Sequence, residues 1–127
     1  MPKKILIVDD DVGLAEEMAE ILRDEGYWVE SASDSSQGEK LIKENTHDIY
    51  LLDYKMSGLS GVDLLRKVKE KNSNSAVFII SGRPFIEKLL KEENVLHLLS
   101  GVVKKPFEIS DLITQIETVL GNERAGP

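Results

Sequence analysis

The chain has 127 residues, a net charge of −7 and no cysteine. This length fits one domain with a buried core, and hydrophobic and charged fractions of 41% and 31% are typical of a globular protein. The acidic balance argues against a nucleic-acid surface, no apolar run could span a bilayer, and the lack of cysteine excludes disulfides and thiolate metal sites. No signal-peptide pattern precedes the first apolar run, so we expect a cytoplasmic protein.

Apolar runs alternate with helical patterns along the chain, at intervals of roughly 25 residues that suit βαβ units. Runs without polar alternation are typical of strands buried on both faces of a parallel sheet. Five such runs predict strands over residues 3–8, 28–32, 49–53, 76–81 and 101–104.

The segments between these strands carry apolar residues at helical spacing. We expect a first helix between Asp11 and Gly26, a second over residues 36–44 and a third after Ser60. A fourth begins near Pro84, and a fifth covers residues 110–120. Residues 94–100 show no clear helical pattern.

Five alternating strand and helix units predict an α/β fold, a doubly wound five-stranded parallel sheet with helices on both faces. Ligands in such folds bind at the carboxyl ends of the strands, near the point where the strand order reverses. We place the domain at residues 3–121 and expect residues 122–127 to form a disordered tail or the stump of a linker.

Polar side chains follow four of the predicted strands, at the point where each strand ends. Asp9 and Asp10 follow the first strand, Asp53 ends the third, Ser81 ends the fourth and Lys105 follows the fifth. At one sheet edge, these would bring together three carboxylates, a hydroxyl and an ammonium group. Such groups can hold Mg²⁺ and accept a phosphoryl group on a carboxylate.

Each of these residues also has a simpler interpretation on its own. Asp11 is placed to cap the next helix, Ser81 before Gly82 fits a turn, and Lys105 fits a solvated strand end. Asp9 and Asp10 favour metal binding over capping, because adjacent carboxylates repel each other unless a cation lies between them. Taken together, the set favours function.

These motifs resemble those of the response-regulator receiver domains of two-component signalling. The resemblance spans nearly the whole chain and rests on Ile5-Leu6-Ile7-Val8-Asp9-Asp10-Asp11, Leu51-Leu52-Asp53 with Met56 and Gly58, Ile79-Ile80-Ser81-Gly82, and Lys105-Pro106-Phe107. It implies a flavodoxin-like sheet with strand order 2-1-3-4-5 and a cis peptide bond at Lys105–Pro106.

The resemblance also implies a role for each site residue. Asp53 would accept the phosphoryl group, Asp10 would bind Mg²⁺ directly and Asp9 would act largely through water. The backbone carbonyl of Lys55 would complete the protein's share of the metal shell, with Asp53 itself as a further ligand. Ser81 would hydrogen-bond a phosphoryl oxygen, and Lys105 would pair with it.

The implied function is a phosphorylation-dependent switch rather than an enzyme, one that catalyses only its own phosphotransfer and dephosphorylation. A sensor histidine kinase or a phosphotransfer protein would supply the phosphoryl group. The face formed by the fourth helix, fifth strand and fifth helix would then regulate an output partner or attached domain, or form a homodimer. No nucleic-acid or membrane contact is expected of this segment.

Three features depart from the family pattern. Ser57 stands where the family usually has proline, Val102 stands where many members have an aromatic residue, and the stretch from Ser81 to Lys105 is slightly long. Two alternatives stay open. The Asp9-x-Asp11 motif resembles that of haloacid-dehalogenase-type phosphatases, and Val102 suits a receiver-like interaction module that ignores phosphorylation.

Overall fold

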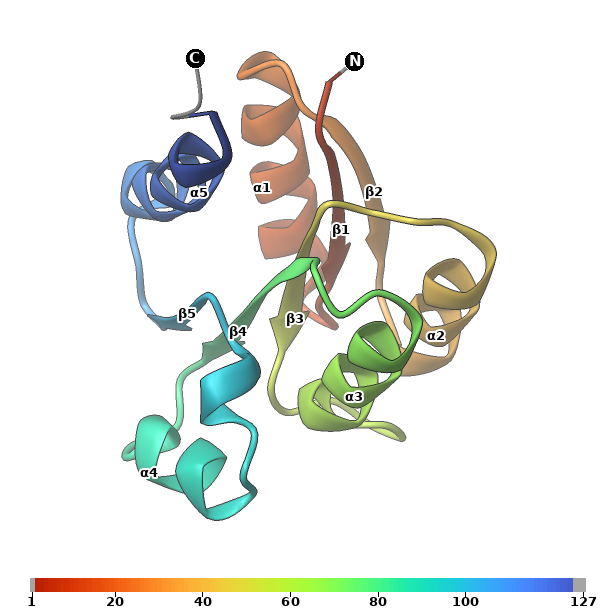
Figure 1. The fold of residues 1–127 in the computed structure, drawn as a ribbon, viewed down its shortest axis with the longest axis vertical. Coiled ribbons are helices and arrows are strands. Elements are labelled where there is room, and N and C mark those ends of the chain that lie inside the picture. Colours follow the sequence, from red (N-terminus) through yellow and green to blue (C-terminus); the bar gives the residue numbers. More distant parts are fainter. Residues whose placement is uncertain (1, 125–127) are drawn as a thin grey trace.

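The structure, a computed structural model, describes residues 2–124 of the chain and the side chains of residues 2–121. Five parallel strands form one sheet in the order β2-β1-β3-β4-β5, which confirms the predicted doubly wound fold (Figure 1). The elements in chain order are β1 (Lys4–Val8), α1 (Val12–Asp24), β2 (Trp28–Ala32), α2 (Ser35–Glu44), β3 (Ile49–Asp53), α3 (Gly61–Lys71), β4 (Ala76–Ser81), α4 (Ile86–Glu92), the 3-10 helix η1 (Leu96–Leu98), β5 (Gly101–Lys104) and α5 (Ile109–Arg124).

Two apolar cores lie on opposite faces of the sheet, which explains why the central strands are apolar without alternation. One core joins the sheet to α1 and α5, through residues such as Met18 and Ile116. The other joins it to α2, α3 and α4, through residues such as Ile42, Leu65 and Leu90. Strands β3 and β4 are buried along their whole length.

The register of the sheet brings the carboxyl ends of its strands to one edge. Val8 pairs with Leu52 across β1 and β3, and Asp53 pairs with Ile80 across β3 and β4. Ser81 pairs with Lys104 across β4 and β5. The polar residues that end these strands therefore lie at the same edge, close to the point where the strand order reverses.

The second half of the chain departs most from the expected elements. Helix α4 begins at Ile86 rather than near Pro84, because Phe85 takes a left-handed conformation with φ of 58° as its N-cap. The short helix η1 lies in the region that showed no helical pattern. Helix α5 continues to Arg124, past the expected boundary at residue 121, and residues 125–127 lie outside the described part. The tail over 122–127 stays a prediction.

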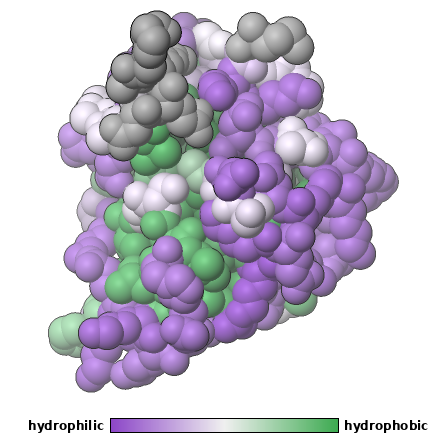
Figure 2. All heavy atoms as spheres, viewed as in Figure 1, coloured by the Kyte–Doolittle hydropathy of each residue, from purple (hydrophilic) through white to green (hydrophobic). Residues whose placement is uncertain are grey.

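Some apolar side chains are partly exposed to solvent around β4, β5 and η1. Figure 2 shows hydrophobic side chains gathered over β4, β5 and η1, with hydrophilic side chains around them. Leu98, Leu99 and Val102 are partly exposed there and pack against the core beneath α3 and α4. In the described residues, no helix is long and apolar enough to cross a membrane.

Candidate functional site

Three carboxylates meet at the carboxyl edge of the sheet, as the sequence predicts. Asp9 and Asp10 follow β1, Asp53 ends β3, and each offers an oxygen atom within 4.8 Å of the others. Asp9 is fully buried, Asp53 is 6% exposed and Asp10 is exposed. The cluster therefore lies at the rim of the core, with one side open to solvent.

The turn that follows β1 holds the Asp9 side chain in place. Its Oδ1 atom accepts a hydrogen bond of 2.9 Å from the backbone N–H of Asp11. Its Oδ2 atom is 3.3 Å from the Lys105 ammonium but has no well-aligned hydrogen bond among the described residues. Asp11 caps α1 by accepting from the N–H of Leu14 at 3.1 Å, which confirms the capping role predicted for it.

Lys105 is the cation that faces this cluster. Its Nζ atom lies 3.3 Å from Asp9 Oδ2 and 3.5 Å from Asp53 Oδ1, so one ammonium group is shared by two carboxylates. Burial works to lower the pKa of Lys105, but the charges of Asp9 and Asp53 prevail and raise it. The backbone N–H of Lys105 donates to the Ser81 carbonyl at 2.8 Å, and the Lys105–Pro106 bond is cis, as predicted.

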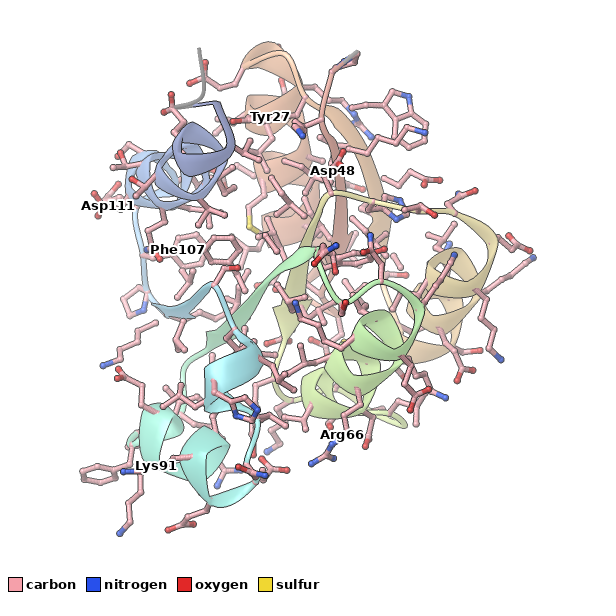
Figure 3. All side chains as sticks on the ribbon, viewed as in Figure 1. Tyr27, Asp48, Arg66, Lys91, Phe107 and Asp111 are labelled. Atoms are coloured by element: carbon pink, nitrogen blue, oxygen red, sulfur yellow. The ribbon has the colours of Figure 1, made fainter. Side chains whose placement is uncertain are left out.

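Phe107 follows Pro106 and lies two residues before the start of α5. Phe107 turns its ring inward from the loop between β5 and α5, where it packs against the core shared with α1 (Figure 3). This contact ties the Lys105 turn to the body of the domain.

Asp53 carries the largest electrostatic perturbation in the site. Burial raises its pKa from the ordinary 3.8 to about 7, the charge of Asp9 adds to the rise, and Lys105 opposes it. A carboxyl group with this pKa is only partly ionised near neutral pH. A cation bound beside it would favour its ionised, nucleophilic form.

Ser81 lies at the same edge, from the neighbouring strand. It is buried, and its Oγ atom accepts a hydrogen bond of 3.0 Å from the N–H of Arg83. This leaves the hydroxyl hydrogen available as a donor. The structure thus brings together Asp9, Asp10, Asp53, Ser81 and Lys105 at one edge.

Lys55 lies in the loop that leads from β3 to α3, with its side chain exposed. Gly58 takes φ of 81°, a conformation that glycine adopts without strain. Ser60 and Asp63 form a capping box that begins α3. The loop is therefore ordered by local contacts, while the role of the Lys55 carbonyl as a metal ligand stays a prediction.

Sequence reasoning missed a polar network next to Asp53. The Tyr54 hydroxyl donates to Glu93 Oε2 at 3.0 Å, and the Arg83 guanidinium lies 5.9 Å from the Tyr54 ring centre. Arg66, which projects from α3 in Figure 3, donates to the Glu93 carbonyl at 3.1 Å. No sequence pattern predicts these contacts, because they join four separate segments.

Comparison with known proteins identifies the family. The family model described as the response regulator receiver domain matches residues 5–117. The chain belongs to this family. Receiver domains act in signalling and are regulated by phosphorylation, and they interact with histidine kinases or phosphotransfer proteins and with output domains.

Two relatives illustrate the range of the family. The chain is 29% identical to the sporulation initiation phosphotransferase F of Bacillus subtilis over 120 residues, which cover 94% of this chain and 95% of that protein. It is 32% identical to the DNA-binding response regulator MtrA of Mycolicibacterium smegmatis, over 100% of this chain and 54% of MtrA. The chain therefore spans about half the length of the MtrA relative and almost all of the phosphotransferase.

Solved structures agree with this assignment. A CheY-like receiver domain protein of Methanospirillum hungatei has a TM-score of 0.88 and 27% identity, with full coverage of both chains. A receiver domain protein of Clostridium thermocellum has a TM-score of 0.83 and 27% identity, over 97% of this chain and 98% of that one. Both support the receiver fold that the strand order shows.

The acidic cluster of this receiver domain suits a hard divalent cation. The family binds Mg²⁺ at its acidic pocket. In this chain, Asp9 keeps a buried oxygen without an aligned hydrogen bond, and Asp10 and Asp53 offer oxygens close to it. Oxygen ligands in this number, open to solvent on one side, match the preference of Mg²⁺ for a few carboxylates and several waters.

Proposed function

We propose that Asp53 is the phosphoacceptor of this receiver domain, and that Asp9, Asp10 and the Lys55 carbonyl hold Mg²⁺ beside it. The observation that carries the proposal is the position of Asp53, a buried carboxylate at a strand end, within 4.8 Å of two further carboxylates and paired with Lys105. Asp11 is engaged as a helix cap, which leaves the phosphatase alternative without its second aspartate.

The proposed reaction uses Asp53 as the nucleophile. An oxygen of the Asp53 carboxylate attacks the phosphorus of a phosphohistidine, the P–N bond breaks, and the imidazole leaves with its electron pair. The product is an acyl phosphate on Asp53, which water later hydrolyses to inorganic phosphate and the free carboxylate. The domain catalyses its own phosphotransfer and dephosphorylation in this scheme.

The chain's own residues stabilise the charge that develops on the phosphoryl oxygens. Lys105, already next to Asp53, pairs with one oxygen, and the Ser81 hydroxyl donates to another. Bound Mg²⁺ would supply further positive charge at the carboxylates and bring the pKa of Asp53 down. Asp9, as a fully buried residue, would hold the ion largely through water.

The partners follow from the same proposal. A sensor histidine kinase or a phosphotransfer protein donates the phosphoryl group, and phosphorylation alters the surface of α4, β5 and α5. That surface then regulates an output partner or an attached domain, or forms a homodimer. The partly exposed Leu99 and Val102 support an interaction there. No nucleic-acid contact is assigned to this segment, and the cytoplasmic location stays a prediction.

The test is phosphorylation by a small donor. The protein is incubated with acetyl phosphate and Mg²⁺, and its intact mass is measured. We expect one added phosphoryl group, none when a chelator removes Mg²⁺, and none with Asp53→Asn. Asp11→Asn is the matched control, because asparagine also caps helices well, and it should be labelled like the wild type. Equal labelling of Asp53→Asn would contradict the proposal.

A further inference from the structure

The loop between β3 and α3, residues 54–60, is fixed at its base by local contacts. The N–H of Gly61 donates to the Tyr54 carbonyl at 3.1 Å, and a side chain at Gly61 would collide with the Asp53 carbonyl. The base therefore holds the chain close to the phosphoacceptor. These contacts leave open what holds the apex of the loop, residues 57–59.

Ser35, from a distant part of the sequence, holds that apex. It is the first residue of α2, and the residue is 4% exposed. Its hydroxyl donates to the Ser57 carbonyl at 2.9 Å and accepts from the N–H of Leu59 at 3.0 Å. One buried hydroxyl thus bridges the backbone of Ser57 and Leu59, the two residues that flank Gly58.

The shape of the loop fits this contact closely. Gly58 has φ of 81°, and a Cβ atom there would lie 2.8 Å from the Ser35 Oγ atom. A side chain at position 58 would therefore strain the backbone and push the hydroxyl away. The turn and the serine form one unit, in which the absence of a side chain at Gly58 lets the Ser35 hydroxyl approach the backbone.

We propose that Ser35 is a positioning residue for the Mg²⁺ site, because it fixes the loop that carries the Lys55 carbonyl. The inference rests on the proposed function, in which that carbonyl is a ligand. A backbone carbonyl cannot change rotamer, so its place depends entirely on the path of the chain. Lys55 lies between two anchors of the chain: β3, which ends at Asp53, and the hydrogen bond from Ser35 to the Ser57 carbonyl.

Removal of the hydroxyl would release two backbone groups. Each lost hydrogen bond weakens the hold on the loop, and a backbone group left buried without a partner is destabilising in itself. The exposed side chain of Ser57 adds little restraint of its own, and Gly58 has no side chain. The apex would then move, and the Lys55 carbonyl would spend less time in the position that a metal ion needs.

The experiment measures Mg²⁺ affinity by isothermal titration calorimetry on the whole chain. We expect Ser35→Ala to bind Mg²⁺ about tenfold more weakly than wild type, at the low end of the loss seen when an outer partner of a metal ligand is removed. Hydrogen exchange at the Leu59 amide, measured without metal, should accelerate. The thermal unfolding temperature is recorded for each variant.

Ser75→Ala provides the matched control. Ser75 is 5% exposed and donates to the Asn72 carbonyl at 2.8 Å, just before β4 at the opposite edge of the sheet. It should lower the unfolding temperature while leaving Mg²⁺ affinity unchanged. A purely structural role for Ser35 would make the two variants behave alike.

Two results would overturn the inference: unchanged Mg²⁺ affinity in Ser35→Ala, or an equal loss in both serine variants. If Ser35→Ala does not fold, Ser35→Cys keeps the volume with a much weaker donor and acceptor, and it should shift affinity in the same direction. Wild-type protein that binds no Mg²⁺ would instead refute the proposed function. An intact wild-type response with an unaffected serine variant refutes only the role of Ser35.

Discussion

The two edges of the sheet both bury ionisable side chains, but they balance charge in opposite ways. At the carboxyl edge, three carboxylates lie together, and two of them, Asp9 and Asp53, share the ammonium group of Lys105. At the amino edge, His47 is buried and its Nε2 atom lies 2.7 Å from Glu30 Oε1, so the polar group meets a matching partner. The first arrangement offers several carboxylate oxygens to a cation, whereas in the second the Nε2 atom of His47 is paired with a carboxylate and its Nδ1 atom has no hydrogen-bond partner among the described residues.

The environment of His47 shows what a structural polar residue looks like in this fold. Its ring lies between Trp28, stacked at 6.4 Å, and Tyr50, edge-on at 5.4 Å. Burial lowers the pKa of His47, and the hydrogen bond with Glu30 partly offsets this effect. Asn45 also donates to Glu30, at 3.0 Å. His47 is thus a buried group paired with an opposite charge, whereas a group crowded by like charges is a candidate for chemistry.

Of the substitutions considered, loss of Lys105 should lower the stability of the metal-free protein most. In Lys105→Met, the buried carboxylates lose their shared cation, and we expect the metal-free protein to lose about 2 kcal/mol of stability, or about 8 °C in unfolding temperature. Millimolar Mg²⁺ should recover much of the loss. Calorimetric unfolding with and without Mg²⁺ measures both effects, and a variant as stable as wild type at pH 8 would show that Lys105 does not balance this cluster.

Loss of Glu30 should affect stability alone. In Glu30→Ala, the imidazole of His47 keeps no acceptor for its Nε2–H group, and we expect a cost of about 1–2 kcal/mol in denaturant unfolding. Mg²⁺ affinity and labelling by acetyl phosphate should match wild type, since the pair lies at the opposite edge. Weakened phosphorylation in a folded Glu30→Ala protein would contradict the division between the two edges.

The sequence predicted the strands well because their signal is local and strong. The predicted bounds match those of β2, β3, β4 and β5, and β1 differs only by beginning at Lys4 instead of residue 3. The site residues were also predictable, because parallel strands carry whatever follows them to one edge. Ser81 and Lys105 are weak signals of function when taken alone. Their predicted position beside the aspartates, at the carboxyl edge of the sheet, is what favours a functional role.

The features that sequence analysis missed depend on contacts between distant segments. Ser35 lay just before the predicted helix over residues 36–44, and its hydrogen bonds to residues 57 and 59 follow from no periodic pattern. The left-handed Phe85 displaced the start of α4, since nothing in Arg83-Pro84-Phe85 marks a positive φ. Tyr54 and Glu93 lie 39 residues apart along the chain. Tertiary packing decides these details.

The raised pKa of Asp53 links pH to both folding and metal binding. The folded protein without metal holds a proton on Asp53 up to a pKa of about 7, whereas an unfolded aspartate releases it near 3.8. The folded state therefore binds more protons between these two values, and this group's contribution to stability falls as pH rises through that window. Mg²⁺ displaces the proton, so its affinity should increase as pH rises through about 7.

The most direct test is the titration of the Asp53 carboxyl carbon by ¹³C NMR, with and without Mg²⁺. The crowded carboxyl edge predicts a pKa of about 7 in the metal-free protein and a marked decrease when Mg²⁺ is added. Asp53→Asn identifies the resonance by its disappearance. A metal-free pKa near the ordinary 3.8, unchanged by Mg²⁺, would show that the carboxyl group of Asp53 is neither perturbed by its surroundings nor close to a bound cation. That result would contradict this account.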